Sequence, residues 1–290
     1  MSVLPPALLA SVLGTLPADV RPGTAPLTHL VSPDSTRPYV TLTFAQSIDA
    51  KIAGAGGKQL ILSGEESMKM THWMRTMHDG ILIGIGTAMN DNPQLNVRHL
   101  PFPVQNTHFQ HYHHPRPLIL DPHLRLSPTC KLVINAAKSA GVAPWVISAR
   151  PPKIDGFFAN EDDGERLQQW EARRDVLQAA GVTVILVEPE TIHPDLPPVT
   201  LNLPLPAVLR TLREKGIRSI MVEGGARVIQ SFLSTASGRL VDALIVTTAP
   251  VLVGRDGIGY GDGLGQVSGT RYLTTELLGR DTVVGLKFAQ

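Results

Sequence analysis

The stretch with the clearest capacity for chemistry is Glu223-Gly224-Gly225, between the short apolar run 219–222 and apolar residues at helical spacing over 228–233. This order predicts a strand, a tight turn and a helix. Glycine lets a ligand approach the backbone closely, and the first N–H groups of a helix suit a phosphate or another anion. Glu223 at the strand end could then hold a polar substrate or transfer a proton. The alternative is an ordinary strand-to-helix turn with an exposed glutamate.

The apolar run 81–86, typical of a strand covered on both faces, ends before a segment that holds Thr87 and Asp91. Because ligands bind at the carboxyl ends of parallel strands, both residues are expected to form part of a cofactor pocket with the Gly225 turn. Gly84-Ile85-Gly86 is only a fragment of the dinucleotide fingerprint. The third glycine and the ribose-binding acid are missing, which excludes a Rossmann domain.

The remaining pattern predicts the elements that position these residues. A short helix at 7–16 lies on a proline-rich arm, and Ser63 with Glu66 forms a capping box for a helix that runs to about residue 78. Further strands are expected at 39–45, 118–121, 145–148, 182–187, 219–222 and 243–248, helices at 165–180 and 207–215, and a hairpin at 272–278 and 282–288. This order predicts an α/β fold with a mainly parallel sheet, an antiparallel C-terminal hairpin and helices on both faces. The expected organisation is an arm over 1–38 and a single domain over 39–290.

Composition limits the classes of function. The 290-residue chain is 43% hydrophobic and 18% charged, with a formal net charge of +1 and no basic block, so nucleic acid is not an expected partner. Cys130 is the only cysteine, which excludes a disulfide framework and a cysteine-based zinc site. No apolar run is long enough to span a membrane, and the first residues lack the charges of a signal peptide. A cytoplasmic protein without membrane contact is therefore expected.

A proline- and histidine-rich insertion spans residues 100–117. The histidines that could bind a metal there are His108, His111, His113 and His114. No carboxylate or cysteine completes a defined ligand pattern around them. A surface loop is therefore the favoured interpretation, and no metal site is expected.

Several motifs occur in order along the chain: Ala45-Gln46-Ser47-Ile48-Asp49-Ala50-Lys51-Ile52-Ala53, Arg75, Gly84-Ile85-Gly86-Thr87, Asp91-Asn92-Pro93, Leu95-Asn96-Val97-Arg98, Val222-Glu223-Gly224-Gly225-Ala226, Leu240-Val241-Asp242 and Ala249-Pro250. Together they resemble the riboflavin-biosynthesis reductases, whose fold is related to that of dihydrofolate reductase. The resemblance covers about residues 39–288. The bacterial relatives carry a zinc deaminase domain that one cysteine cannot supply, so the chain is most similar to the stand-alone fungal branch. Ala50 stands where the bacterial pattern has glycine, as in that branch.

The resemblance implies a homodimer that uses NADPH to reduce the ribosylamino group of a diaminopyrimidinone 5′-phosphate to a ribitylamino group. It implies cofactor contacts from Ala45, Thr87, Asp91, Gly224, Gly225, Ala226, Arg227 and Val228, and substrate contacts from Arg75, Leu95, Arg98 and Glu223. The candidates for assisting ring opening or donating a proton are Lys51, Glu223 and Asp49, and the residues alone do not choose among them. Arg150, or alternatively Arg227, would meet the cofactor 2′-phosphate.

Two other classes of function remain open. A reductase of the same fold that acts on another heterocycle, such as a pterin, is disfavoured by Arg75 and Arg98, which suit a phosphate that pterins lack. A non-catalytic nucleotide-binding protein is disfavoured by the presence of Lys51, Asp91 and Glu223. Without the resemblance, Arg75 would be assigned to a solvated helix face, and Asp91 to a turn or to the cap of a helix.

The homodimer is expected to form through the C-terminal half of the chain. The apolar run 243–248 and the segment 249–254 follow each other near the chain end. A bare sheet edge there would expose unpaired backbone groups, so it must be covered.

Overall fold

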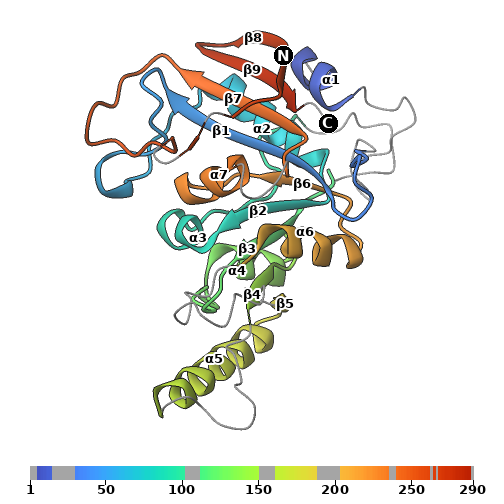
Figure 1. Ribbon diagram of the computed structural model, residues 1–290, viewed down its shortest axis with the longest axis vertical. Helices are drawn as coiled ribbons and strands as arrows, with labels where there is room; N and C mark the ends of the chain where they lie inside the picture. The colour runs from blue at the N-terminus through green and yellow to red at the C-terminus, as the bar shows by residue number, and fades with distance from the viewer. Residues whose placement is uncertain are drawn as a thin grey trace.

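A nine-stranded sheet organises the chain, and Figure 1 shows its strands and helices in the computed structural model. The structure describes residues 5–14, 30–101, 112–149, 161–187, 203–234, 240–261, 264–265 and 267–288. The strands are β1 Tyr39–Ser47, β2 Gly80–Gly84, β3 Arg116–Leu120, β4 Trp145–Ala149, β5 Thr183–Val187, β6 Ser219–Val222, β7 Ala243–Ala249, β8 Thr270–Leu278 and β9 Asp281–Phe288. The helices are α1 Ala7–Leu13, α2 Glu65–Thr76, α3 Ile85–Asp91, α4 Lys131–Ala137, α5 Glu161–Ala179, α6 Leu205–Glu214 and α7 Ala226–Leu233, with a 3₁₀ turn at Ala55–Gly57.

The sheet is parallel over most of its width. The strand order is β5-β4-β3-β2-β6-β1-β7-β9-β8. The strands from β5 to β7 pair in parallel, whereas β9 pairs antiparallel with β7 and with β8. The mainly parallel sheet and the antiparallel C-terminal hairpin expected from the sequence are therefore confirmed.

Strand β7 is not an edge strand. It pairs with β1 on one side and with β9 on the other. The expectation of a bare sheet edge at 243–254 is therefore wrong, because the final hairpin folds back onto β7. The two outer strands of the described sheet are β5 and β8.

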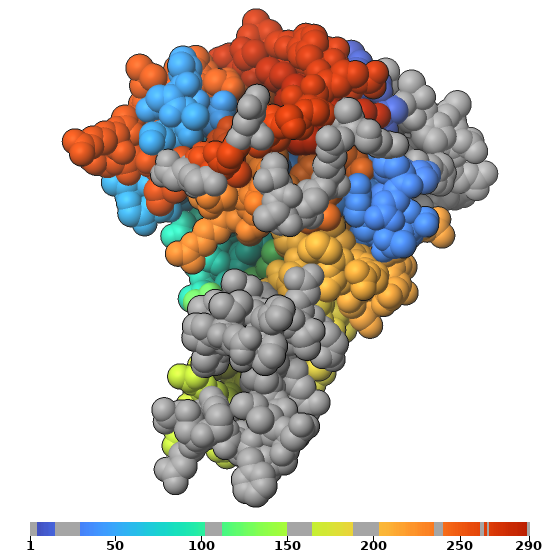
Figure 2. Space-filling model, in the orientation of Figure 1, coloured from blue at the N-terminus to red at the C-terminus, as the bar shows by residue number. Residues whose placement is uncertain are grey.

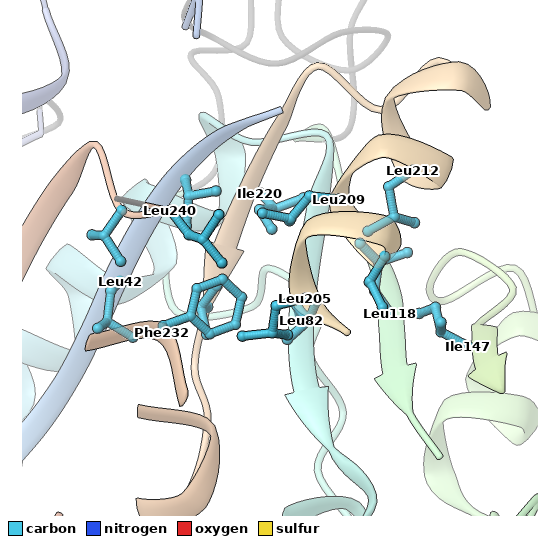
Figure 3. Packing of buried hydrophobic residues seen from close by; sticks show 14 of the residues in the cluster. Leu42, Leu82, Leu118, Ile147, Leu205, Leu209, Leu212, Ile220, Phe232 and Leu240 are labelled. Carbon is cyan, nitrogen blue, oxygen red and sulfur yellow. The ribbon is translucent and has the colours of Figure 1, made fainter. Parts of the chain in front are cut away.

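One core lies between the sheet and helices α6 and α7 (Figure 3). Alternate residues of neighbouring strands point to this side, because side chains along a strand alternate between its two faces. The labelled strand residues of this core are Leu42, Leu82, Leu118, Ile147 and Ile220, and the labelled helix residues are Leu205, Leu209, Leu212 and Phe232.

The opposite face of the sheet is covered by α1 to α5. Met70 of α2 packs with Met221 of β6, and farther along the sheet Ile119 of β3 packs with Leu132 of α4 and Trp170 of α5. Helices on both faces are therefore confirmed. Helix α4 is not among the elements expected from the sequence, because its seven residues are too few to show a clear helical period. No helix within the described ranges is both long and apolar enough to cross a membrane.

Helix α2 begins one residue later than expected and is capped from a distant part of the chain. Its N-cap is Gly64, which has no side chain to cap the helix. Asp281, at the start of β9, instead accepts hydrogen bonds from Gly64 N at 2.7 Å and from Ser67 Oγ at 2.5 Å. The expected capping box of Ser63 and Glu66 is therefore wrong, because the Asp281 carboxylate satisfies this helix terminus.

Strand β2 ends at Gly84, two residues earlier than the apolar run predicts, and Ile85 begins α3. A Cβ on Gly84 would lie 2.9 Å from Val228 Cγ2, so glycine allows α7 to pack against the strand end. Ile85 is buried as the first residue of α3. A continuous apolar run does not separate a buried strand from the first turn of a buried helix, which explains the difference.

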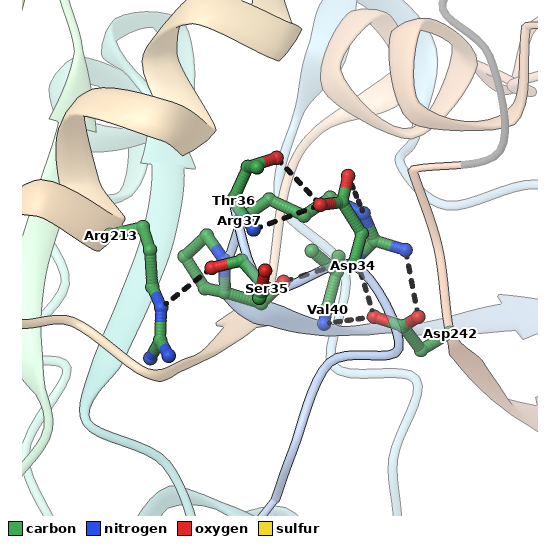
Figure 4. A network of polar contacts seen from close by, with 8 residues as sticks. Asp34, Ser35, Thr36, Arg37, Val40, Arg213 and Asp242 are labelled. Carbon is green, nitrogen blue, oxygen red and sulfur yellow. Dashed lines mark hydrogen bonds and ion pairs between the residues drawn. The ribbon is translucent and has the colours of Figure 1, made fainter.

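The described parts of the N-terminal arm pack on the rest of the fold. Helix α1 lies against β8 and β9, and Leu8 N donates to Glu276 Oε2 at 2.8 Å. Arg37 forms two hydrogen bonds with the carboxylate of Asp242, at 2.7 and 2.8 Å, and this carboxylate also accepts from Val40 N at 2.7 Å (Figure 4). The short helix near the start of the chain is confirmed, whereas a division at residue 38 stays a prediction.

Candidate active site

The carboxyl ends of β1, β2, β6 and β7 meet at one edge of the sheet, from which α3 and α7 depart (Figure 1). Thr87 lies in the first turn of α3, and Gly225 is the N-cap of α7. A Cβ on Gly225 would lie 3.0 Å from Thr87 Oγ1, so the threonine hydroxyl lies directly beside the glycine turn. The two residues are therefore neighbours, as expected from the sequence. Their part in binding a cofactor stays a prediction.

The turn between β6 and α7 presents backbone N–H groups at this edge. A Cβ on Gly224 would clash with the Val228 side chain, so only glycine permits this close packing. The Gly225 carbonyl accepts a hydrogen bond from Val228 N at 2.9 Å. The N–H groups of Ala226 and Arg227 have no partner inside the helix, because they belong to its first turn. The N-terminus of α7 carries partial positive charge, and the two glycines before it have no side chains that would keep a ligand away from the backbone. Both properties suit an anionic group such as a diphosphate.

Glu223 directly precedes this turn and forms a bidentate ion pair with Arg75 of α2. Arg75 Nε donates to Glu223 Oε1 at 3.0 Å, and Arg75 Nη2 donates to Glu223 Oε2 at 2.8 Å. Arg75 Nη1 donates to the carbonyl oxygen of Asn96 at 2.9 Å. The Arg75 side chain is 8% exposed and that of Glu223 is 19% exposed, so the pair is largely shielded from water. Arg75 therefore is not on a solvated helix face; it orients the Glu223 carboxylate.

Arg98 lies near this ion pair and keeps most of its donors unused within the described part of the chain. Its Nη1 donates to Asn96 Oδ1 at 3.1 Å, and the residue is exposed. Burial of part of its side chain lowers the pKa of Arg98, the charge of Arg75 lowers it further, and the charge of Glu223 raises it. A guanidinium nevertheless stays protonated under all physiological conditions. Arg98 is thus a cation that a phosphate can reach from solvent.

Asp49 joins the turn after β1 to the segment after β7. It accepts hydrogen bonds from Ser47 Oγ at 2.6 Å, from Val253 N at 3.0 Å and from Gly254 N at 2.7 Å. These bonds, that from Ser47 above all, lower the pKa of Asp49 to about 2. Asp49 is therefore ionised near neutral pH. Its contacts fit a residue that organises two loops and argue against a proton donor.

Lys51 extends along the glycine-rich segment after β7. A Cβ on Gly257 would lie 2.9 Å from Lys51 Cγ, and a Cβ on Gly259 would lie 4.0 Å from Lys51 Nζ. The absence of side chains on these glycines leaves the space that Lys51 occupies. Within the described ranges, neither a hydrogen bond nor an ion pair joins Lys51 to Glu223.

The segment after β7 folds against the turn after β1. Ala53 forms a β-bridge with Ile258, and Ile258 N donates to Ala53 O at 2.9 Å. The Tyr260 hydroxyl donates to Gln46 Oε1 at 2.9 Å, and the Tyr260 ring lies 4.6 Å from that of Phe44. Figure 2 shows light-blue atoms of the segment after β1 next to orange atoms of the segment after β7, at the upper left of the view. The two segments thus form one side of the candidate site, next to the carboxyl end of β7.

The other residues predicted to contact the cofactor lie on elements around this edge. Ala45 pairs with Thr247 where β1 runs beside β7. Asp91 is the last residue of α3 and accepts a hydrogen bond from the preceding asparagine side chain at 2.6 Å. Arg227 is exposed in the first turn of α7. Arg150, the alternative candidate for the 2′-phosphate, lies outside the described residues.

Leu95, predicted to contact the substrate, has a buried side chain. Leu95 is 3% exposed and belongs to the core between the sheet and helices α3, α4 and α5. Any contact with a substrate would therefore come from its backbone or from its neighbours.

The histidine-rich insertion contributes hydrogen bonds to the fold. His113 Nε2 lies 3.1 Å from a backbone carbonyl oxygen, and His114 Nδ1 accepts a hydrogen bond from Val97 N at 3.0 Å. Among the residues that the structure describes, no group of three or more histidine, cysteine, aspartate or glutamate side chains is arranged to hold a metal ion. His108 and His111 lie outside the described residues.

Two residues that the sequence did not single out connect the charged side chains. Asn96 accepts hydrogen bonds from Arg75 and from Arg98. His72 Nδ1 accepts a hydrogen bond from Arg98 N at 3.2 Å. His72 precedes Arg75 by three positions on α2, and residues at this spacing share a helix face. This spacing was the one signal in the sequence that could have identified His72.

The strand order and the helices on both faces define a mixed α/β protein with a mostly parallel sheet. A sequence profile of the RibD C-terminal domain matches residues 38–284, and the chain belongs to the RibD C-terminal domain family. The resemblance that the ordered motifs indicated is therefore confirmed.

Fungal relatives align with most of the chain. The 2,5-diamino-6-ribosylamino-4(3H)-pyrimidinone 5′-phosphate reductase of Debaryomyces hansenii is 34% identical over 234 residues, which cover 79% of this chain and 82% of the relative. The Saccharomyces cerevisiae protein of the same name is 30% identical over 226 residues, covering 76% of this chain and 75% of the relative. The chain thus aligns over most of the length of these reductases.

Solved structures show the same fold. The riboflavin biosynthesis reductase of Saccharomyces cerevisiae matches with a TM-score of 0.59 and 24% identity, covering 89% of this chain and 93% of that chain. A pyrimidine reductase-like protein from Corynebacterium diphtheriae matches with a TM-score of 0.63 and 18% identity, covering 98% of this chain and 99% of that chain. The chain therefore has the dihydrofolate-reductase-like fold of the riboflavin-biosynthesis reductases.

Proposed function

We propose that this chain uses NADPH to reduce the ribosylamino group of 2,5-diamino-6-ribosylamino-4(3H)-pyrimidinone 5′-phosphate to a ribitylamino group. The observation that carries the proposal is the direct succession of Glu223 and the Gly224-Gly225 turn at the end of β6. One stretch of backbone would thus hold a substrate-binding carboxylate beside a nucleotide-binding turn. Membership of the RibD C-terminal domain family and the names of the fungal relatives support the proposal.

The residues at the start of α7 fit the diphosphate of NADPH. The first N–H groups of α7 point out of the helix, and Gly224 and Gly225 leave their backbone accessible. The Thr87 hydroxyl, beside Gly225, would add a hydrogen bond. Bound NADPH would supply the hydride, and the protein would position the sugar carbon that receives it. A preference over NADH stays a prediction, for which the exposed Arg227 is the described candidate.

The two arginines have different contacts and so are assigned different parts. Arg75 uses three donors on Glu223 and Asn96, and would hold Glu223 in place. Arg98, with one side-chain bond and an exposed guanidinium, would bind the substrate 5′-phosphate. Glu223 would accept hydrogen bonds from the ribose hydroxyls or the pyrimidine amino groups.

Reduction of the glycosylamine requires the open-chain imine, whose C1′ takes the hydride and whose nitrogen takes a proton. Lys51 and Glu223 remain the candidates to assist ring opening or to deliver this proton. Asp49 is the weakest of the three candidates, because hydrogen bonds hold its pKa at about 2. The Lys51 ammonium, beside Gly259, can donate without giving up another contact in the described part of the chain.

The direct test is an assay of NADPH consumption with the ribosylaminopyrimidine phosphate. The expected result is loss of NADPH absorbance together with a product two hydrogens heavier. Dihydrofolate and the dephosphorylated pyrimidine serve as controls, and both are expected to react slowly or not at all. Folded protein that binds NADPH but leaves the phosphorylated substrate unreduced would refute the proposal.

A homodimer formed over the outer strand β8 is the second part of the proposal. Tyr272 and Leu277 of β8 are 61% and 71% exposed, so this outer strand presents large apolar side chains that a second copy of the chain would cover. Sedimentation at micromolar concentration should show a dimer, and Leu277→Lys should shift it toward monomer. A monomeric wild type would exclude the dimer, and an unchanged Leu277→Lys dimer would place the interface elsewhere. The cytoplasmic location expected from the sequence also stays a prediction.

A further inference from the structure

Two consecutive backbone N–H groups beside the Arg75–Glu223 pair donate to histidine side chains. Val97 N donates to Nδ1 of His114 at 3.0 Å, and Arg98 N donates to Nδ1 of His72 at 3.2 Å. His72 lies on α2, and His114 lies just before β3. The segment that carries Arg98 is therefore held from two separate elements of the fold.

These contacts define the protonation state and the tautomer of both imidazole rings. An imidazole nitrogen accepts a hydrogen bond only when it carries no proton, so each ring must be neutral with its proton on Nε2. For His72 this form is favoured strongly, because burial and then the charges of Arg75 and Arg98 lower its pKa to about 2. The unprotonated Nδ1 of His72 therefore serves as an acceptor for the backbone of Arg98 near neutral pH.

The held segment has an unfavourable backbone conformation. Asn92 and Leu95 have φ angles of 41° and 52°, in the left-handed region that a leucine rarely adopts. Such residues keep this conformation only where their surroundings impose it. The Leu95 side chain is anchored in the core, and Asn92 Oδ1 accepts a hydrogen bond from Lys131 N at 2.9 Å. Beyond Leu95, the histidine contacts continue this anchoring.

The segment joins the two arginines of the proposed substrate site. The carbonyl oxygen of Asn96 accepts from Arg75 Nη1 at 2.9 Å, while its side-chain oxygen accepts from Arg98 Nη1 at 3.1 Å. A shift of the backbone at residues 96–98 would therefore move Arg98 and would release one donor of Arg75. The position of the segment and the geometry around Glu223 are coupled.

Packing alone does not explain the presence of His72. The residue is fully buried, and its Nε2 has no hydrogen-bond partner among the described residues. Burying a polar group without a partner is unfavourable, and an apolar side chain would fill the same space without this penalty. The ring packs edge-to-face against His99, with the ring centroids 4.6 Å apart, and within the described ranges its hydrogen bond is the one that Nδ1 accepts from Arg98 N.

We propose that His72 and His114 are positioning residues that fix the backbone of Val97 and Arg98, and so place the Arg98 guanidinium for the substrate phosphate. The inference rests on the proposed function for its kinetic consequence. The backbone restraint itself does not depend on that function. Neither histidine contacts the substrate in this account; both act through the segment that carries Arg98.

Asparagine and glutamine variants of each histidine distinguish the restraint from simple packing. The Asn side-chain oxygen can occupy the place of Nδ1, so His72→Asn and His114→Asn retain an acceptor for the backbone. The longer Gln side chain places its polar group near Nε2, so His72→Gln and His114→Gln leave the backbone N–H without a partner. His123→Gln, at an exposed histidine after β3, is the matched control.

Hydrogen exchange over residues 95–99, measured by mass spectrometry, reads the restraint without requiring activity. We expect faster exchange there in the Gln variants, and exchange close to that of wild type in the Asn variants and in His123→Gln. With the phosphorylated substrate, the Gln variants should raise KM by roughly three- to tenfold, the effect of one lost hydrogen bond, at unchanged NADPH affinity. If His72→Gln does not fold, the His114 variants carry the same comparison.

Asn and Gln variants that match wild type in exchange and in KM would overturn the proposal. Equal effects of Asn and Gln, in proportion to lost stability, would also overturn it, since they would show that the rings only fill space. If the wild type reduces no substrate, the proposed function fails, but the exchange measurement still decides whether the histidines restrain the segment.

Discussion

The side-chain contacts of Arg75 and Arg98 indicate different roles for these two arginines in the candidate site. Arg75 is buried and directs three donors to Glu223 and Asn96, so its removal would release the carboxylate that it orients. Arg98 is exposed and makes one side-chain hydrogen bond, so its charge is available to a ligand. A site with one oriented carboxylate and one free guanidinium fits a substrate that carries both hydroxyl donors and a phosphate.

Replacement of Arg98 by alanine should mainly weaken substrate binding. Loss of one charge-assisted contact of about 1.5–3 kcal/mol would raise KM for the phosphorylated substrate by roughly ten- to a hundredfold. The rate at saturation and the affinity for NADPH should change little. Steady-state kinetics and NADPH titration check this, with Arg210→Ala on the surface of α6 as the control. A KM equal to that of wild type would remove Arg98 from the phosphate site.

Replacement of Gly225 by alanine should weaken the binding of NADPH. The backbone of Gly225 suits any residue, but the new Cβ would lie 3.0 Å from Thr87 Oγ1, closer than most such contacts. Overpacking of this kind and the loss of close backbone approach should raise the Kd for NADPH by roughly tenfold. Gly141→Ala is the control, because the nearest atom to its new Cβ would be 3.8 Å away. An unchanged Kd would separate the turn from the cofactor.

Helix α2 connects the core to the candidate site. Met70 and Met74 of this helix are fully buried in the core, while His72 and Arg75 face the charged group around Glu223. The start of the helix is held by Asp281 from the final hairpin. The position of Arg75 therefore depends on packing and capping contacts that come from elements at both ends of the chain.

Removal of the Asp281 carboxylate should destabilise the fold. Asp281→Ala leaves Gly64 N and Ser67 Oγ without their acceptor, which should cost about 1–3 kcal/mol of unfolding free energy. Asp281→Asn, which keeps one acceptor oxygen, should lose less. Urea denaturation gives the values, and Asp175→Ala, an exposed residue of α5, should change stability by less than about 0.5 kcal/mol. Equal stability of wild type and Asp281→Ala would contradict the cap.

At the scale of the whole molecule, two buried histidines link stability to pH. His78 accepts a hydrogen bond from Thr41 Oγ1 and donates to the Met74 carbonyl, both at 2.8 Å, and is fully buried. Burial lowers the pKa of His78 from 6.5 to about 4, and lowers that of His72 to about 2. Between these values and 6.5 the unfolded chain binds protons that the folded protein does not. Stability should therefore fall as the pH falls below 6.5.

The contribution of His78 can be measured directly. Each pKa unit corresponds to about 1.4 kcal/mol, so up to about 3 kcal/mol of stability should be lost between pH 6.5 and about 4 because of this residue. Urea denaturation of wild type over this range should show the loss. His78→Gln should show a shallower dependence on pH, from a lower starting stability, and His123→Gln should follow the wild type. Parallel curves for wild type and His78→Gln would contradict the assignment.

Several features of this protein follow from short stretches of sequence. The alternation in β1, the strand, turn and helix around Gly225, and the final hairpin depend on residues close together in the chain, and all were predicted. Glu223 directly precedes the glycine turn in the chain, so a carboxylate beside an anion-binding turn could be expected without a structure. Local periodicity and glycine conformation are sufficient causes for such elements.

Other features depend on which strands become neighbours. The sequence left Arg75 between a solvated surface and a substrate contact, and it assigned the start of α2 to a local cap. In the structure, Arg75 pairs with Glu223 across 148 positions, and Asp281 caps α2 across 217 positions. Both contacts exist because β6 inserts between β2 and β1, and because the last hairpin returns to β7. A single sequence pattern records the period of each element but not its neighbours, so only the tertiary structure decided these contacts.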